Sequence, residues 1–174
     1  MKKKIVTALV ACFAALPLVA QNDPDSVFII RERDAMDGRE YTFTSRAFLV
    51  ANSERDKGFR VDVHIRDGLS FGFLTVEMFG IGACNEHDEI IILLANGEKI
   101  QKRSWKGFNC KGDAYFYLSH SEINLLRKVP LSKIRVTNMR SFESYTGEVK
   151  EADRRYFIQV FHALDNGLVS ERKE

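Results

Sequence analysis

The sequence contains only three cysteines, and none of them belongs to a Cys-x-x-Cys pair. Zinc sites usually show such a pair, so the cysteine pattern predicts no metal centre. Internal repeats, low-complexity tracts and linkers are also lacking, which favours one domain in a chain of 174 residues. With 45% hydrophobic and 29% charged residues, the composition is typical of a globular protein and excludes a disordered or membrane-embedded chain.

Acidic residues are missing from the first 20 positions, which begin with a run of three lysines and continue with an apolar stretch from Ile5 to Ala20. This pattern predicts a signal peptide at residues 1–20 that is cleaved after Ala20. The apolar stretch is short for a membrane span, so we expect no transmembrane segment in the mature form. Residues 21–174 are expected to form a single exported domain with an ordered core from about residue 24 to 168.

A second interpretation of the leader is that it carries a lipid. Leu9-Val10-Ala11-Cys12 resembles the bacterial lipobox, whose cysteine becomes a lipidated N-terminus. The apolar residues that follow Cys12 argue against it, because a polar tether is expected there. In either case the domain leaves the cytoplasm and is periplasmic or extracellular.

The net charge changes once the leader is removed. The whole chain has 26 Lys plus Arg and 24 Asp plus Glu, a net charge of +2, and three of the lysines lie in the leader. The mature balance is therefore 23 against 24, or −1. A near-neutral domain has no general attraction for nucleic acid or for an anionic membrane.

The two remaining cysteines lie on either side of a predicted hairpin. Two extended segments surround Asn96-Gly97, a pair that favours a two-residue turn. Continuing the register of such a turn places Cys84 opposite Asn109, next to Cys110. We expect a Cys84–Cys110 disulfide in the oxidising compartment to which the leader directs the chain. Two reduced, buried cysteines are the alternative.

Alternating apolar and polar residues predict a strand at Phe59–Ile65, and a second follows at Leu69–Phe79 beyond an Asp67-Gly68 turn. With a two-residue turn, Phe73 would lie on the polar face of this pair, unless a bulge shifts the register. The apolar run Ile90–Leu94 predicts a central strand covered on both faces. Further strands are expected near residues 27–32, 41–50, 114–118, 133–138 and 144–149.

Two helices are predicted. Ser119 and Glu122 match the capping box ahead of a short helix that ends before Pro130. A C-terminal amphipathic helix is expected from about residue 152 to 165, with Gly167 as its stop. The predicted fold class is therefore α+β and mainly antiparallel β, with a sandwich- or barrel-like sheet, a short internal helix and a C-terminal amphipathic helix.

Cations and aromatic residues are mixed beyond the predicted hairpin. This group suits stacking on a glycan or binding of an acidic peptide, although the rings could simply cover the disulfide. The residues that we select as the candidate binding surface are Arg103, Trp105, Lys106 and Phe108.

Two weaker patterns suggest catalysis. Gly68-Leu69-Ser70-Phe71-Gly72 matches the nucleophile elbow of hydrolases, but the residues after Ser70 favour a strand where the elbow needs a helix. The polar cluster Asn85–Glu89, which contains His87, offers carboxylates and an imidazole for a cation without a known ligand spacing. We therefore predict no catalytic residue, no metal and no cofactor.

Three stretches are similar to those of uncharacterised secreted proteins of Bacteroidetes: Val19-Ala20-Gln21, Phe108–Gly112 followed by Ala114–Phe116, and Lys133–Val136 ahead of the last helix. The similarity covers roughly residues 80 to 165, and its motifs are structural. The resemblance implies bacterial export and assigns a role to no residue.

The function that these observations favour is an exported, non-enzymatic binding or structural domain whose partner is a protein, a glycan or an envelope component. One alternative is a small secreted hydrolase or metal-dependent enzyme that uses Ser70 or His87. Another is a small-molecule carrier, in which the sheet curls around Phe71 and Phe73 to enclose an apolar ligand.

Mass spectrometry of the protein exported by a bacterial host tests the leader and the disulfide together. We expect a chain that starts at Gln21 and gains about two daltons on reduction, as one disulfide requires. An intact chain that starts at Met1 and carries free thiols would contradict both expectations.

Overall fold

Strands β4 (Gly58–Arg66) and β5 (Phe71–Phe79) form the longest hairpin among the residues that the structure describes. We describe the protein from a computed structural model, which covers residues 29–33, 36, 40–44, 46–66, 71–82, 84–105, 109–110, 112–167 and 169–171. The hairpin is the centre of a sheet ordered β11-β1-β2-β4-β5-β8, with β3 paired to β4 beside β2. Its other strands are β1 (Ile29–Arg33), β2 (Glu40–Thr44), β3 (Phe48–Ala51), β8 (Asp113–Tyr117) and β11 (Val169–Glu171).

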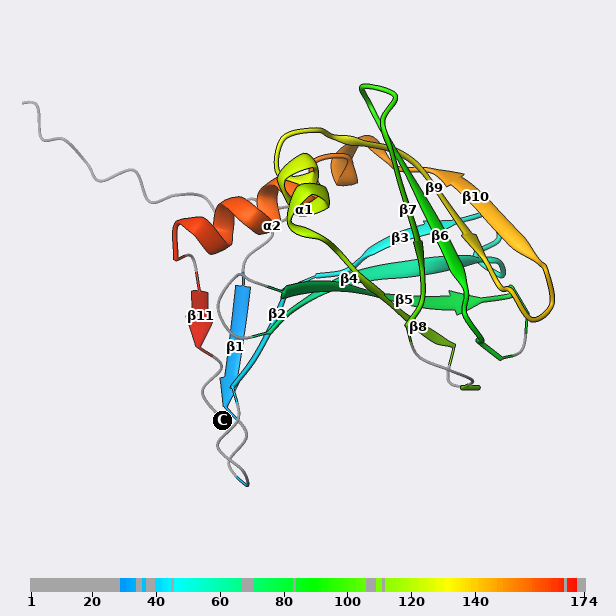
Figure 1. Ribbon diagram of the computed structural model, residues 1–174, viewed down its shortest axis with the longest axis horizontal. Helices are drawn as coiled ribbons and strands as arrows, with labels where there is room; N and C mark the ends of the chain where they lie inside the picture. The colour runs from blue at the N-terminus through cyan, green and yellow to red at the C-terminus, as the bar shows by residue number, and fades with distance from the viewer. Residues whose placement is uncertain are drawn as a thin grey trace, which may run out of the picture.

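A second sheet, ordered β10-β9-β6-β7, lies against the first. Figure 1 shows β6, β7 and β9 running steeply across β4 and β5, with α1 and α2 together at one end. Apolar side chains from both sheets and both helices fill the space between them. The strands and helices of this part are β6 (Glu89–Leu94), β7 (Lys99–Arg103), β9 (Leu131–Thr137), β10 (Ser144–Glu148), α1 (His120–Leu126) and α2 (Tyr156–Asp165). The predicted α+β, mainly antiparallel fold class is confirmed.

The pairing of β4 with β5 confirms the predicted alternation. The register runs without interruption from Gly58 opposite Phe79 to Arg66 opposite Phe71. Val61 and Val76 face each other on the inner side and are fully buried. Arg66 pairs with Phe71, two residues further along the chain than a two-residue turn would allow. Because this shift is an even number of residues, each side chain of β5 stays on the face that was predicted for it. Phe73 therefore lies on the outer face without a bulge.

The hairpin between β6 and β7 differs from its prediction by one residue. The Leu94 N–H donates to the Glu98 carbonyl at 2.9 Å, so the loop has three residues and ends at Gly97, whose φ is +88°. This loop places Ile92 opposite Ile100. Both side chains are buried, whereas the two-residue turn would have placed a polar side chain opposite Ile92. Burial of apolar surface thus determines the register.

Strand β6 is central, as predicted, because it pairs with β7 on one side and β9 on the other. The prediction that both of its faces are covered is wrong. Only alternate residues are buried, and Ile91 and Leu93 are partly exposed on the outer side of the second sheet. A sheet that packs on one side needs only one apolar face.

The sulfur atoms of Cys84 and Cys110 lie at disulfide distance, 2.11 Å apart, as predicted. The residues next to them, Asn85 and Asn109, form an isolated β-bridge with backbone hydrogen bonds of 2.7 and 3.0 Å. The predicted position of Cys84 opposite Asn109 is therefore wrong by one residue. On the chain-entropy account, closing a loop of this size stabilises the fold by about 3–4 kcal/mol.

The strand predicted at residues 41–50 is divided into β2 and β3, which pair with successive parts of β4. Thr44, the last residue of β2, has its hydroxyl 2.9 Å from the buried Tyr156 hydroxyl of α2. Phe48, the first residue of β3, packs its ring edge-on against the same tyrosine at 4.8 Å. The ends of both strands at this break therefore contact α2.

The C-terminal region departs from its prediction where its helix begins. A 3₁₀ turn (Glu151–Asp153) precedes α2, which begins at Tyr156 instead of near residue 152. The predicted stop at Gly167 is confirmed by its φ of +62°. Beyond the helix, β11 adds to the edge of β1 in parallel, with Ile29 opposite Val169.

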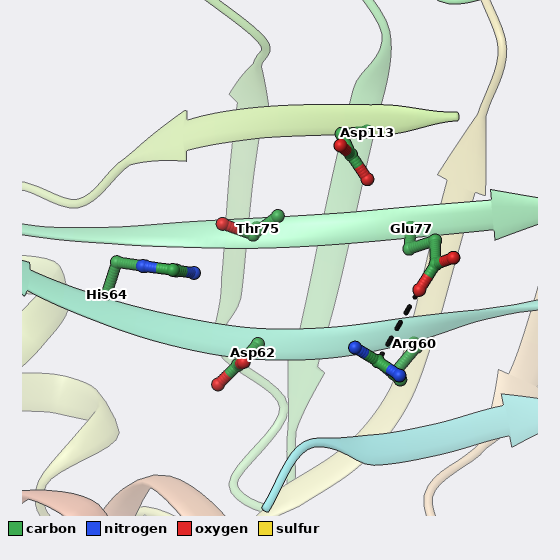
Figure 2. Close-up of a pocket in the computed structure, with 6 residues that line it drawn as sticks. All are labelled: Arg60, Asp62, His64, Thr75, Glu77 and Asp113. Atoms are coloured by element: carbon green, nitrogen blue, oxygen red, sulfur yellow. Dashed lines mark ion pairs between the residues drawn. The ribbon is translucent and has the colours of Figure 1, made fainter. Parts of the chain in front are cut away.

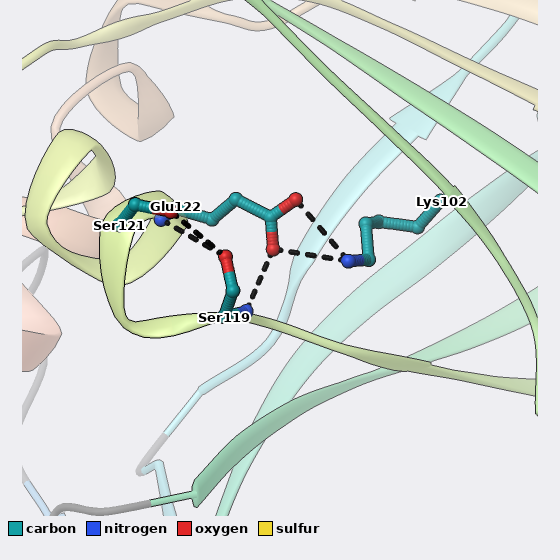
Figure 3. A network of polar contacts seen from close by, with 4 residues as sticks. All are labelled: Lys102, Ser119, Ser121 and Glu122. Carbon is teal, nitrogen blue, oxygen red and sulfur yellow. Dashed lines mark hydrogen bonds and ion pairs between the residues drawn. The ribbon is translucent and has the colours of Figure 1, made fainter.

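Helix α1 begins with the predicted capping box (Figure 3). The Ser119 N–H donates to the Glu122 carboxylate at 2.7 Å, and the Glu122 N–H donates back to the Ser119 hydroxyl. Lys102 of β7 adds an ion pair to Glu122 at 3.1 Å. Burial alone would raise the pKa of Glu122, but the hydrogen bonds from Ser119 and the Lys102 ammonium together lower it below its usual value.

Glu122→Gln is expected to destabilise the protein by about 1 kcal/mol at neutral pH, because it removes the charged part of the capping box. The pKa of Glu122 is lowered in the folded state, so its contribution is complete above the ordinary pKa of 4.5 and is lost as the pH falls through the folded value. Denaturant unfolding at several pH values should therefore show the variant approaching the natural protein in acid. The control, Glu148→Gln in a more exposed ion pair with Lys133, should change stability less.

Gly147→Ala tests the packing of β10 against β3. A Cβ at Gly147 would lie 2.3 Å from Cγ1 of the buried Val50 side chain, so we expect a loss of about 1–3 kcal/mol in the free energy of unfolding. Adding Val50→Ala removes the clash, and Gly147→Ala should then cost much less. Equal costs of Gly147→Ala in the two backgrounds would show that this contact is unimportant.

Candidate functional site

The outer face of β4, β5 and β8 carries side chains in three rows, because each residue has a direct partner on the neighbouring strand. The first row is charged, the second is mixed and the third is aromatic. In order across the three strands, the rows are Arg60–Glu77–Asp113, Asp62–Thr75–Tyr115 and His64–Phe73–Tyr117. None of these nine side chains is fully buried, and we call them the outer face.

A shallow depression of about 90 Å³ lies within the outer face. Figure 2 shows His64 reaching from β4 and Asp113 from β8 toward the middle strand, which carries Thr75. The remaining lining residues are Arg60, Asp62 and Glu77. A space of this size holds a few water molecules or a small substituent, but not a sugar ring.

The charges of the depression are only partly balanced. Arg60 pairs with Glu77 at 3.5 Å, and both side chains are more than half exposed. Among the residues that the structure describes, the Asp113 carboxylate has neither an ion pair nor a hydrogen bond. Burial raises the pKa of Tyr115, and the negative charge of Asp113 raises it further. The Thr75 hydroxyl is buried without a hydrogen-bond partner in the same part of the chain.

Asp62 is held from behind by a buried polar group. Its carboxylate accepts short hydrogen bonds from the Thr44 hydroxyl and from the Val63 N–H. Thr44 contacts the Tyr156 hydroxyl, which in turn donates to the Arg46 carbonyl at 2.8 Å. Burial is the main cause that raises the pKa of Tyr156 well above that of a free tyrosine, so this side chain remains a neutral hydroxyl. Asp62 therefore keeps one fixed orientation.

An aromatic series crosses the other end of the face. His64 stacks on Phe73 with ring centroids 5.2 Å apart, and Phe73 contacts Tyr117 at 6.4 Å. Trp105 continues the series beyond β8, since its ring stacks on Tyr117 at 5.1 Å and meets Tyr115 at 6.3 Å. Trp105 and Tyr117 remain 48% and 44% exposed, so each leaves about half of its surface open to a ligand.

The backbone fixes Trp105 beside β8. Its N–H donates to the Tyr115 carbonyl at 3.1 Å, and the preceding residue, Ser104, donates its N–H to the Asp88 carbonyl at 2.8 Å. Trp105 is thus held to the edge of the first sheet although it follows β7 of the second. The indole contacts the rings of Tyr115 and Tyr117.

The residues predicted as a binding surface do not all appear at this site. Trp105 joins the outer face, and Arg103 is an exposed residue at the end of β7. Lys106 and Phe108 lie outside the described residues. Lys102, also on β7, forms an ion pair with Glu122 of α1.

The predicted catalytic patterns find little support in the fold. Ser70 lies outside the described residues, and the segment that follows it is the strand β5 instead of the helix that a nucleophile elbow requires. Phe73 lies on the outer face, which does not fit the expected apolar ligand enclosed by the sheet. The side chain of Phe71 is not among those described.

The polar cluster Asn85–Glu89 has a structural role. Asp88 is completely buried and accepts hydrogen bonds from the Asn85 amide at 2.6 Å and from the Met139 N–H at 3.0 Å. His87 is exposed in a turn with a φ of +52°. Across the described ranges, no three His, Cys, Asp or Glu side chains gather in a way that could hold a metal ion.

The sequence did not identify the carboxylates of the outer face, Thr75 or Tyr117 as candidate site residues. The alternation along residues 58–66 indicates an outward polar face, but the neighbours of that face depend on β8 pairing with β5 across two intervening strands. The aromatic residues of the Asp113–Tyr117 segment were the feature of the sequence that could have indicated this part of the site.

Comparisons with known proteins give no further assignment. No family model, curated protein or solved structure matches the chain. Within the part of the chain that the structure describes, no helix is both long and apolar enough to cross a membrane.

Proposed function

We propose that this protein is an exported, non-enzymatic binding domain that binds a glycan on its outer face. The stacked, half-exposed pair of Trp105 and Tyr117 is the observation that carries the proposal. Aromatic rings present a flat apolar surface with a polar edge, which suits the apolar face of a sugar ring. Export is supported by the predicted leader and by the two cysteines at disulfide distance.

The polar part of the outer face supplies the second requirement for sugar binding. Sugars carry many hydroxyl groups, which need hydrogen-bond partners when they leave water. The carboxylates of Asp62, Glu77 and Asp113 accept hydrogen bonds, while Arg60 and the Thr75 hydroxyl donate them. Because these groups lie in rows next to the aromatic series, one ligand can contact both.

The openness of the face favours a chain-like ligand over a small apolar molecule. Sites for small apolar ligands are concave and enclose most of the ligand. The depression here is about 90 Å³, and the rings beside it lie on a sheet surface. An oligosaccharide that extends along the strands matches this shape.

The single tryptophan of the chain makes the proposal directly testable, because all tryptophan fluorescence comes from Trp105. Titration with a panel of soluble oligosaccharides should change this fluorescence for at least one glycan. Tyr117→Ala should weaken binding about tenfold by removing half of the stacked pair, as measured by calorimetry.

Phe142→Ala is the matched control, since Phe142 is a 76% exposed aromatic residue in the turn between β9 and β10. This variant should bind the glycan as the natural protein does. A panel without any binder, or an equal loss of binding in both variants, would contradict the proposal. Binding of a protein partner with no glycan involved would also contradict it.

A further inference from the structure

We propose that the glycan bound by the outer face carries a positively charged amino group, which binds in the depression at Asp113 and Thr75. This inference rests on the proposed function, because it specifies the ligand of the same face. It starts from the charge of the depression. Three carboxylates line it against one guanidinium and one imidazole, so it is negative at neutral pH.

Two of the three carboxylates already have partners. Glu77 pairs with Arg60, and Asp62 accepts hydrogen bonds from Thr44 and Val63. Asp113 is the exception within the described residues, having no ion pair and no hydrogen bond. A carboxylate without a partner favours a cation, and an ammonium group offers three donors for it.

Thr75, on the floor of the depression, supplies a polar group that could also bind the amino group. The Oγ1 atom of Thr75 is shielded from solvent and has no hydrogen-bond partner among the described residues, which is costly for a polar group. Thr75 lies on β5, between the strands that carry His64 and Asp113, and the His64 ring extends toward it (Figure 2). An ammonium group that enters here can donate hydrogen bonds to the Thr75 oxygen and to the Asp113 carboxylate.

The size of the depression indicates which part of the ligand enters it and which part stays outside. A volume of about 90 Å³ admits a substituent such as an amino group, whereas the ring that bears it stays on the surface. From Asp113 to Tyr117 on the same strand, four residues span about 13 Å. This distance is longer than one sugar ring, so the ligand that reaches both Asp113 and the Trp105–Tyr117 pair has at least two rings.

Two ligands that differ only in charge test this inference. We compare the tetramer of β-1,4-linked glucosamine, whose amines are free, with its N-acetylated counterpart at about pH 6, where sugar amines are charged and aspartate stays ionised. Calorimetry should show the free-amine tetramer binding about tenfold more tightly, with an advantage that decreases as salt is added. The free-amine dimer should still bind, and the monomer should bind much more weakly than either.

Asp113→Asn should bring the two tetramers to nearly equal affinity, because it removes the unpaired charge and keeps the shape of the side chain. Glu98→Gln, at the distant β6–β7 turn, is the control and should keep the full preference. Thermal unfolding of each variant confirms that it is folded.

The outcomes separate this inference from the proposed function. Equal binding of both tetramers, or tighter binding of the acetylated one, would overturn the amino-group inference and leave glycan binding in place. Loss of preference in Glu98→Gln as much as in Asp113→Asn would overturn the role of Asp113. If a tetralysine peptide bound as tightly as the glucosamine tetramer while no glycan changed Trp105 fluorescence, both proposals would fail in favour of a basic protein segment.

Discussion

The unbroken register between β4 and β5 is the constraint on which both the core and the outer face depend. Successive side chains of a strand point to opposite faces, so the residues that fill the core also determine which residues face outward. A slip of one residue would bury charged side chains such as Asp62 and expose Val61 and Val76. The energetic cost of that exchange keeps the side chains of the outer face on the outer side of the sheet.

Local patterns predicted the parts of the fold that local interactions determine. The alternation at Phe59–Ile65 and the capping box of Ser119 and Glu122 both appear as expected, since each depends on residues close together in the sequence. The break between β2 and β3 could not be found in this way. The break lies where Thr44 contacts Tyr156, and these residues are 112 positions apart in the sequence.

The hairpin at Asn96-Gly97 shows how the core can override turn chemistry. The pair of residues favours a two-residue loop, but only the three-residue loop brings Ile100 opposite Ile92 inside the core. The site could be predicted only in part for the same reason, because its residues are brought together by long-range packing. Trp105 is recognisable in the sequence as an isolated large ring, whereas its partners Tyr115 and Tyr117 come from a strand that is placed by sheet order.

The hydrogen bond between Asp62 and Thr44 joins the outer face to the helix that covers the core, since Thr44 also contacts Tyr156 of α2. A carboxylate that is already oriented loses little conformational entropy when a ligand arrives. The same connection links binding to folding. If a ligand binds Asp62 more tightly while Thr44 and Tyr156 hold this carboxylate, its occupancy reduces the population of molecules in which α2 opens. The affinity of the outer face for its ligand would then depend on whether α2 is docked. Slower amide hydrogen exchange in α2 would in turn indicate that the outer face is occupied.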